Sequence, residues 1–339
     1  MYHFLVKNSQ KRKHLFDFLF LVCYDKLKLI KSSISYNGKV DLILNLRYNN
    51  KGFYSRRLIM AKNILVSPVV KWVGGKRQLL NEIIPLLPKH ITSYCEPFLG
   101  GGAVLFSIQP KKAIINDLNS DLISMYEVIR DNVEELILDL EKHKNTPEYF
   151  YAMRDKDRKK ELYESMTKIE RASRLLYLNK TCYNGLFRVN TAGEFNSPFG
   201  HYKNPTIVNA PVLRAVNKYF QTNTIEFCNE DFSTVLAKVK KGTFVYLDPP
   251  YDPVSDTSSF TGYNRGGFDK EEQIRLKNSC DELNRRGIKF MLSNSATDFI
   301  KNLYREYTIT IVKAKRAINA DPNKRGEIEE VIITNYEKE

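Results

Sequence analysis

The chain has 339 residues and a net charge of +14, with 53 Lys and Arg against 39 Asp and Glu. Hydrophobic residues make up 42% and charged residues 27% of it, which excludes a disordered chain and indicates a globular one. No apolar run approaches the roughly 18 residues of a membrane span, so we expect no membrane partner, and the positive charge suggests nucleic acid instead.

Residues 1–60 differ from the rest of the chain in charge and composition. They hold twelve Lys and Arg against three Asp, so nine of the fourteen net positive charges lie there. They contain no Ala, Glu, Pro, Thr or Trp, and their apolar patch, Leu15–Tyr24, lacks the cleavage site of a secretory signal. Two interpretations remain: a basic extension that binds nucleic acid, or translated upstream sequence with Met60 as the natural start. The second is favoured, because the stretch lacks two of the usual helix formers.

Strands and helices alternate from residue 68 onward. The expected strands end at Cys95–Glu96 or span Lys112–Asn116, Thr224–Phe227, Thr243–Leu247, Ile288–Leu292, Tyr307–Ala314 and Ile328–Tyr336, the last two flanking a turn at Asp321–Pro322. Helices are expected near Gly101, after Asp231, over Lys270–Arg286 and over Leu118–Lys142, where apolar residues recur at helical spacing. Residues 147–222 are expected to be mainly helical, with a polar loop at Thr181–Asn204.

This order predicts an α/β fold, a Rossmann-like, doubly wound and mostly parallel sheet with an antiparallel edge hairpin. Residues 61–145 and 223–339 would form this domain, and residues 146–222 an inserted, mainly helical one. Ligands of such sheets bind outside the carboxyl ends of the strands. Four acidic residues stand at or just after predicted strand ends: Glu96, Asp117, Asp231 and Asp248. We therefore expect the functional site at that edge.

The segment Asp248-Pro249-Pro250-Tyr251 carries the most specific chemical signal. Two consecutive prolines cannot continue a strand ladder, so the chain must leave the sheet there. A carboxylate, the carbonyl of Pro249 and an aromatic ring then lie within one turn. This set suits an exocyclic amine, which offers two N–H donors beside a flat ring. The alternative is an Asp that caps an ordinary loop.

The segment Glu96–Gly102 is a glycine-rich strand-to-helix turn, which lets backbone approach a ligand closely. About twenty residues later the next strand ends at Asp117, at the spacing of a ribose-binding carboxylate. Gly74–Arg77 lacks the glycine spacing and the Ser or Thr of a phosphate-binding loop. A nucleoside-like ligand without phosphates therefore fits best.

Over residues 68–336 the chain resembles the Dam-type family of DNA adenine-N6 methyltransferases. The resemblance is carried, in the motif order of the family's alpha class, by Lys71–Lys76, Glu96–Gly102, Asn116–Asn119, Cys182–Gly200, Asp248–Tyr251, Ser259–Thr261 and Leu292–Asn294. It implies S-adenosylmethionine as the cofactor, no metal, and double-stranded DNA as the substrate, methylated at adenine N6 within GATC. The target base would be flipped out of the duplex, and an in-line displacement would transfer the methyl group.

The resemblance also implies roles for individual residues. The cofactor site would comprise Trp72, Lys76, Glu96, Phe98, Gly100, Gly102, Asp117, Asp231 and Asp248. The catalytic segment would be Asp248, Pro249, Pro250 and Tyr251, in which Asp248 and the Pro249 carbonyl hold the adenine amine and Tyr251 stacks on the base. DNA contacts would come from Lys71, Tyr183, Asn184, Leu186, Arg188, Pro198 and Tyr202. Among these, Tyr183 and Asn184 would fill the space of the flipped base, and Leu186 and Arg188 would read base edges.

Several alternatives remain open at this stage. Methylation of cytosine N4, of RNA or of a protein glutamine uses similar Pro-Pro-Tyr chemistry, and a non-catalytic DNA-binding relative would keep the fold. Cytosine-C5 methylation is excluded, because no Cys here follows the Pro that this reaction's nucleophile requires. Five Cys without a close pair and five His without ligand spacing predict a reduced, cytoplasmic chain without a metal site. We expect a monomer, with a cognate restriction endonuclease as a possible partner.

Overall fold

The computed structural model describes residues 62–337, except residue 73 and the segments 255–266 and 316–326. Three expectations lie outside the described residues: those on the extension 1–60, on the Ser259–Thr261 motif and on the turn at Asp321–Pro322. Within the described part, no helix is long and apolar enough to cross a membrane.

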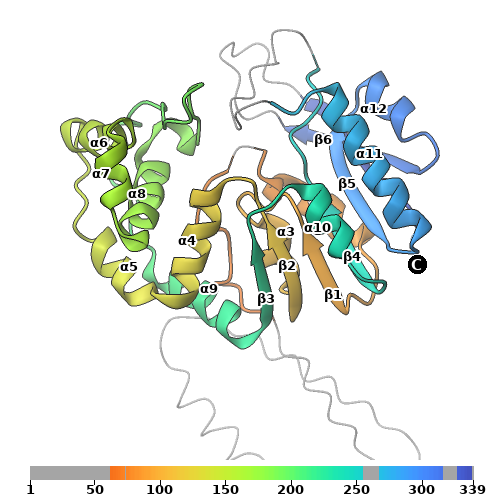
Figure 1. The fold of residues 1–339 in the computed structure, drawn as a ribbon, viewed down its shortest axis with the longest axis horizontal. Helices are drawn as coiled ribbons and strands as arrows, with labels where there is room; N and C mark the ends of the chain where they lie inside the picture. Colours follow the sequence, from red (N-terminus) through yellow and green to blue (C-terminus); the bar gives the residue numbers. More distant parts are fainter. Residues whose placement is uncertain (1–61, 73, 255–266, 316–326, 338–339) are drawn as a thin grey trace, which may run out of the picture. The chain divides into compact units, whose positions relative to one another are not determined.

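A seven-stranded sheet in the order β3-β2-β1-β4-β5-β7-β6 forms the centre of the fold (Figure 1). The strands are β1 (Ser93–Glu96), β2 (Lys112–Asn116), β3 (Thr224–Cys228), β4 (Thr243–Leu247), β5 (Phe290–Ser295), β6 (Thr308–Lys315) and β7 (Glu327–Thr334). Neighbours among β1 to β5 are parallel, whereas β7 lies between β5 and β6 and is antiparallel to both. The expected mostly parallel sheet with an antiparallel edge hairpin is confirmed.

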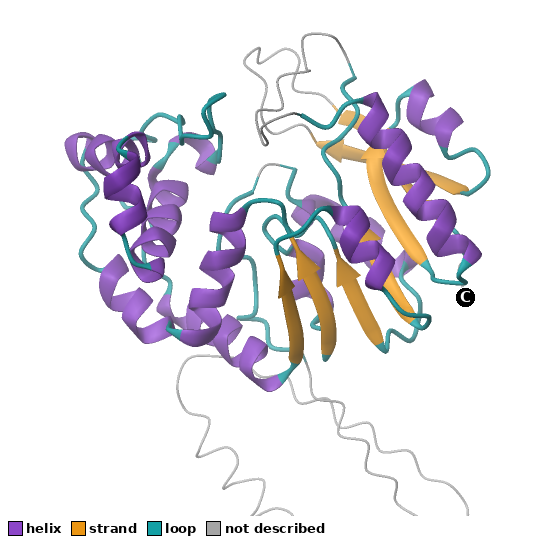
Figure 2. Ribbon diagram, in the orientation of Figure 1, coloured by secondary structure: helices purple, strands orange, loops and turns teal. Residues whose placement is uncertain are grey.

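Helices flank this sheet (Figure 2). They are α2 (Leu80–Ile83), α3 (Ala103–Ile108), α4 (Ser120–Asp131), α5 (Val133–Leu140), α6 (Pro147–Arg154), α7 (Lys160–Ser165), α8 (Lys168–Thr181), α9 (Ala210–Thr222), α10 (Phe232–Lys238), α11 (Lys270–Arg285) and α12 (Asp298–Leu303). Short 3-10 turns accompany them: η1 (Lys76–Leu79), η2 (Ile84–Leu86), η3 (Asp155–Arg158) and η4 (Tyr183–Gly185). Residues 147–222 are therefore mainly helical, as expected.

Two apolar cores cover the two faces of the sheet, because successive strand residues point to opposite sides. Phe244 and Tyr246 of β4 belong to the core that also takes in residues of α3, α4, α5, α8 and α9. Val245 and Leu247 of the same strand belong to the other core, with residues of α10, α11 and α12. This alternation makes the sheet doubly wound. The first core continues without a break from the sheet into the helical part of the chain.

The single helix expected over Leu118–Lys142 is wrong, since the structure has two. Asn132 separates α4 from α5 with a φ of −138° and a ψ of 44°, which lie outside the helical region. Asn favours such breaks because its short polar side chain competes with helical hydrogen bonds. The break reorients the chain so that α4 and α5 both pack against α8.

The fifth strand begins two residues later than expected. The Ile288 N–H donates to the Leu283 carbonyl at 2.9 Å, and the Gly287 N–H donates to the Asn284 carbonyl at 2.9 Å. These bonds form a Schellman cap on α11, with Gly287 at a φ of 66°. Ile288 therefore belongs to the end of the helix, and β5 starts at Phe290.

Candidate active site

The path of the chain reverses between β1 and β4. From β1 it runs outward to β2 and β3, and it then returns to β4 on the other side of β1. Ligands of open α/β sheets bind outside the carboxyl ends of the strands at such a switch point. Glu96 ends β1, Asp117 follows β2 and Asp248 follows β4. Three of the four predicted carboxylates thus lie at this point.

The turn between β1 and α3 requires glycine at two positions. Gly100 and Gly102 have φ angles of 48° and 66°, a region that favours glycine. A Cβ on Gly100 would lie 2.8 Å from Cδ1 of Trp72, so the turn and the indole are in close contact. The Gly100 N–H donates to Asp117 Oδ2 at 2.8 Å. Trp72, the glycine turn and Asp117 therefore form one continuous wall of the site.

Burial raises the pKa of all three carboxylates, Glu96, Asp117 and Asp248. Glu96 is 2% exposed and accepts a hydrogen bond from the Tyr94 hydroxyl at 2.7 Å. Its burial, and the nearby carboxylates of Asp248 and Asp117, raise the pKa of Glu96 to about 8. Burial likewise raises the pKa of Asp248 to about 6, although Lys76 beside it acts in the opposite direction. Because a nearby positive charge favours the ionised form of these buried carboxylates, the site favours a ligand that carries positive charge.

Asp248 belongs to a chain of polar contacts that reaches β7. Lys76 Nζ lies 2.8 Å from Asp248 Oδ1, donates to the Gly74 carbonyl at 2.7 Å, and lies 4.3 Å from the centre of the Tyr251 ring. The Tyr251 hydroxyl donates to Glu330 Oε2 at 2.8 Å. These contacts orient the Tyr251 ring beside the Asp248 carboxylate. Glu330 was not expected from the sequence, because it lies 79 residues from Tyr251 with no local motif to mark it.

Buried amides support the loop that carries the two prolines. Gln273 Nε2 donates to the Pro250 carbonyl at 2.9 Å, and Asn294 Nδ2 donates to Gln273 Oε1 at 3.0 Å. Asn294 Oδ1 accepts the Asp252 N–H at 3.0 Å. No hydrogen bond among the described residues uses the Pro249 carbonyl. Within that part of the chain, its oxygen can accept a hydrogen bond from a ligand.

Asp231 and Phe98 have surroundings different from those of the other predicted cofactor residues. Both oxygens of Asp231 bind the Arg275 guanidinium, at 2.7 and 2.8 Å, and one also accepts the Ser233 N–H at 2.9 Å. The Arg275 hydrogen bonds hold the pKa of Asp231 well below its usual range. Phe98 packs against Phe232, with ring centres 5.3 Å apart. Asp231 therefore joins α10 to α11, and its predicted place near a cofactor stays a prediction.

Most of the predicted DNA contacts lie on the surface. Lys71, Tyr183, Asn184, Arg188 and Pro198 are exposed, whereas Leu186 and Tyr202 are half-buried. Asn184 has a φ of 56°, a left-handed conformation that Asn tolerates. Lys71 Nζ lies 5.5 Å from the centre of the Tyr202 ring, so two of the predicted contacts are neighbours.

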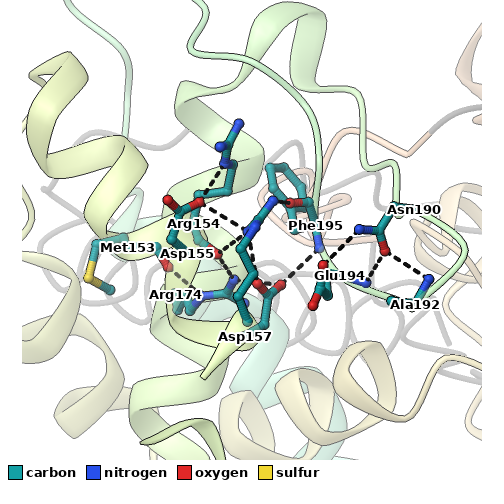
Figure 3. A network of polar contacts seen from close by, with 10 residues as sticks. Met153, Arg154, Asp155, Asp157, Arg174, Asn190, Ala192, Glu194 and Phe195 are labelled. Atoms are coloured by element: carbon teal, nitrogen blue, oxygen red, sulfur yellow. Dashed lines mark hydrogen bonds and ion pairs between the residues drawn. The ribbon is translucent and has the colours of Figure 1, made fainter. Parts of the chain in front are cut away.

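Residues 188–196, which we call the recognition hairpin, fold back through a bridge between Val189 and Phe195. Arg188 lies at its base, where its Nε donates to Asn196 Oδ1 at 2.7 Å. Asn190 closes the turn, since its Oδ1 accepts the N–H groups of Ala192 and Glu194, both at 3.0 Å (Figure 3).

Two hydrogen bonds to the Phe195 backbone, supported by an ion pair, clamp the recognition hairpin to the helical part of the chain (Figure 3). Asp157 Oδ2 accepts the Phe195 N–H at 2.8 Å and lies 2.8 Å from the buried Arg174 guanidinium. Arg158 donates to the Phe195 carbonyl at 3.1 Å. Arg174 also donates to the Met153 carbonyl at 2.7 Å. The position of the hairpin is thus set by η3 and α8, a role for Asp157 that sequence patterns did not reveal.

The site as a whole combines two acceptors and an aromatic ring with a carboxylate-rich wall. It can hold an amine on a flat ring beside a cationic ligand, with an exposed polar loop nearby. Among the described residues, no group of three or more His, Cys, Asp or Glu could hold a metal ion.

The chain is similar to known proteins along most of its length. Residues 72–318 match the family described as D12 class N6 adenine-specific DNA methyltransferase. The chain is 41% identical over 281 residues to the Type II methyltransferase M1.LlaDCHI of Lactococcus lactis subsp. cremoris, which covers 82% of this chain and 99% of that one. It is 43% identical over 294 residues to the Type II methyltransferase M.MjaIII of Methanocaldococcus jannaschii, with 80% and 99% covered. It is 34% identical over 267 residues to the DNA adenine methylase of Escherichia coli K12, with 78% and 93% covered.

Proposed function

Since this chain belongs to the D12 class of N6 adenine-specific DNA methyltransferases, we propose that it uses S-adenosylmethionine to methylate adenine within GATC in double-stranded DNA. Methylation of adenine N6 in DNA follows from the family. The cofactor, the GATC site and the residue roles are proposed. The proposal depends most on one observation: the Asp248 carboxylate, the Pro249 carbonyl and the Tyr251 ring meet at the switch point of the sheet.

The charge of the site supports S-adenosylmethionine, which supplies an electrophilic methyl group on a cationic sulfur. Asp117 and Asp248 would attract its sulfonium and ammonium groups, and Glu96 would lose its proton and become charged when it binds. Trp72 and the glycine turn would line its binding site, with Phe98 and Asp231 farther along the strand ends. Lys76, paired with Asp248 at 2.8 Å, would keep that carboxylate charged.

The acceptor pair supports an amine as the target. Lys76 contacts Oδ1 of Asp248, so Oδ2 can accept one N–H of the adenine amine while the Pro249 carbonyl accepts the other. These bonds would hold the nitrogen lone pair in line with the methyl group, and orientation supplies much of the acceleration in such reactions. The amine needs no strong base if its proton leaves after the attack. Tyr251, held by Glu330 at 2.8 Å, would stack on the flipped base.

Residues 146–222 would form the target-recognition domain. Tyr183 and Asn184 would fill the space that the flipped adenine leaves, which offsets part of the few kcal/mol that flipping costs. Leu186 and Arg188 would read base edges, and a bidentate Arg–guanine contact contributes about 1–3 kcal/mol of discrimination. Lys71, Pro198 and Tyr202 are further proposed contacts.

Plasmid protection tests the substrate, the base and the site together. A GATC-containing plasmid treated with the enzyme and S-adenosylmethionine should resist a nuclease that cuts only unmethylated GATC and should become a substrate for one that requires N6-methyladenine there. A plasmid whose GATC sites are changed to GTTC should gain no methyl groups. Methyl incorporation into the changed plasmid would show another recognition site, and incorporation as N4-methylcytosine would overturn the target base.

Two of the most similar proteins are named Type II methyltransferases, and we propose that this chain also works beside a restriction endonuclease, as a monomer in the cytoplasm. In the native host, deletion of the methyltransferase gene should be lethal only while the nuclease gene is present. Survival of a strain that loses the methyltransferase alone would identify a solitary enzyme.

A further inference from the structure

One buried side chain joins residues 71–76, which belong to the proposed cofactor site, to residues 181–204, which we call the recognition loop. Asn179 of α8 is fully buried. Its Oδ1 accepts the Lys71 N–H at 2.8 Å, and its Nδ2 donates to the Lys71 carbonyl at 2.7 Å and to the Gly185 carbonyl at 3.2 Å. One amide thus holds the backbone of Lys71 and Gly185, which belong to segments more than a hundred residues apart, in a single arrangement.

Two further contacts join the same segments. The Trp72 and Phe187 rings are stacked, with centres 4.7 Å apart and planes 20° apart. A Cβ on Gly185 would lie 2.5 Å from the Lys71 side chain, so that side chain packs against the Gly185 backbone as closely as glycine permits. Trp72 also touches the glycine turn at Gly100. A continuous path of contacts therefore runs from the glycine turn at Gly100, through Trp72, to the recognition loop.

We propose that Asn179 is a positioning residue that couples the two sites, so that cofactor binding strengthens DNA binding and the reverse. The inference rests on the proposed function, since it takes S-adenosylmethionine and GATC duplex as the two ligands. A ligand that orders Lys71 and Trp72 would also order Gly185 and Phe187, because the Asn179 side-chain amide binds the backbone of both Lys71 and Gly185. The second ligand then has less conformational freedom to remove. Without the Asn179 amide, the segments that contain Lys71 and Gly185 could each change conformation independently of the other.

Trp72 provides a direct measurement, because it is the one tryptophan of the chain. Its fluorescence would report cofactor affinity with and without a GATC duplex, and S-adenosylhomocysteine in place of S-adenosylmethionine would prevent turnover. DNA affinity measured with and without the cofactor gives the factor by which the cofactor strengthens DNA binding. Linkage requires this factor to equal the one by which DNA strengthens cofactor binding. In the unmodified enzyme we expect a coupling factor of about 5–150.

The deciding comparison is between Asn179→Ala and a matched control, Asn217→Ala. Asn217 Nδ2 also bridges two carbonyls, those of Ile129 and Arg130, at 3.0 and 2.7 Å, but it joins α9 to α4. Asn179→Ala should reduce the coupling factor to near one, whereas Asn217→Ala should lower stability and leave coupling unchanged. Phe187→Leu removes the ring stacked on Trp72 and should also weaken coupling, which keeps the test valid if Asn179→Ala does not fold.

Unchanged coupling in Asn179→Ala and Phe187→Leu would overturn the proposal, and so would the absence of coupling in the unmodified enzyme. Failure of the unmodified enzyme to bind S-adenosylmethionine or to protect GATC would instead overturn the proposed function. The two failures are therefore distinguishable.

Discussion

At the scale of single residues, the Asp248 carboxylate is the group on which catalysis should depend most. Asp248→Ala should lower methyl transfer by at least about 100-fold, because the amine loses an acceptor that orients it. The fold should persist, since Lys76 keeps its bond to the Gly74 carbonyl at 2.7 Å. Incorporation of tritiated methyl groups measures the rate, and circular dichroism checks the fold.

Asp248→Asn is the matched variant, since it keeps the shape and one carbonyl acceptor. It should retain more activity than Asp248→Ala. Turnover of the Ala variant at the rate of the unmodified enzyme would contradict the role assigned to this carboxylate.

Cofactor binding should release a proton from Glu96. Burial raises the pKa of Glu96 to about 8, so this carboxyl is mostly protonated near neutral pH in the free enzyme. A cation beside it favours the ionised form, lowers its pKa and expels the proton. Cofactor affinity should therefore increase as the pH rises toward 8.

Calorimetry in two buffers of different protonation enthalpy measures that proton directly. Glu96→Gln, which cannot ionise, should abolish the release and flatten the pH dependence. An equal binding enthalpy of the unmodified enzyme in both buffers would contradict the prediction.

Site residues were predictable where the residues that act together are neighbours in the sequence. Asp248, Pro249 and Tyr251 adjoin one another, and the prolines themselves indicate where the strand ends. Glu330, Asn179 and Asp157 were not predictable in this way. Each acts on a segment brought to it by the fold, and an isolated Glu, Asn or Asp on a strand or helix carries no local signal of that partner.

At the scale of elements, the clamp on the recognition hairpin should control discrimination between DNA sites. Asp157→Asn removes the charge that pairs with Arg174 at 2.8 Å and weakens the hold on Phe195. The Asp157→Asn enzyme should then prefer GATC over sites with one base changed less strongly than the unmodified enzyme does. The lower limit is the preference of Arg188→Ala, which we expect to lose about 1–3 kcal/mol of discrimination. The ratio of kcat/KM values for the two duplexes measures it, and cofactor affinity should not change.

Glu134→Gln is the control for Asp157→Asn. It breaks the exposed Glu134–Arg214 pair, 2.7 Å long, and exposed ion pairs contribute little to stability. Neither discrimination nor cofactor affinity should respond. If Asp157→Asn lowered the melting temperature without changing discrimination, the clamp would be structural only.

The bounds of elements were predictable where burial determines them. β2 and β4 begin and end at the expected residues. In each, a short apolar run is bounded by polar residues, which marks both ends of a buried strand. The break at Asn132 was missed, since apolar positions keep helical spacing on both sides of it. The insertion of β7 between β5 and β6 depends on strand pairing, which hydropathy does not specify.

At the scale of the whole molecule, net charge proved a weak guide to the DNA substrate. Nine of the fourteen net positive charges lie in residues 1–60, and the other 279 residues carry only five. The case for DNA depends on the position of a few groups instead: the exposed Arg188 at the base of the recognition hairpin, Lys71 beside Tyr202, and the acceptors at the strand ends.

A chain that begins at Met60 should therefore methylate GATC as well as the full chain does. None of the motifs lies in residues 1–60, and the family match begins at residue 72. Each cation that contacts a phosphate contributes about 0.9 to the slope of log affinity against log salt concentration. If residues 1–60 make such contacts, the shortened chain should bind non-specific DNA more weakly at low salt and with a smaller slope. The value of kcat/KM for a GATC duplex at physiological salt should stay within about a factor of two, since phosphate contacts carry no sequence information and the residues proposed to read GATC lie outside residues 1–60. A much lower kcat/KM, or a native protein whose intact mass begins at Met1, would instead identify a basic extension that takes part in DNA binding.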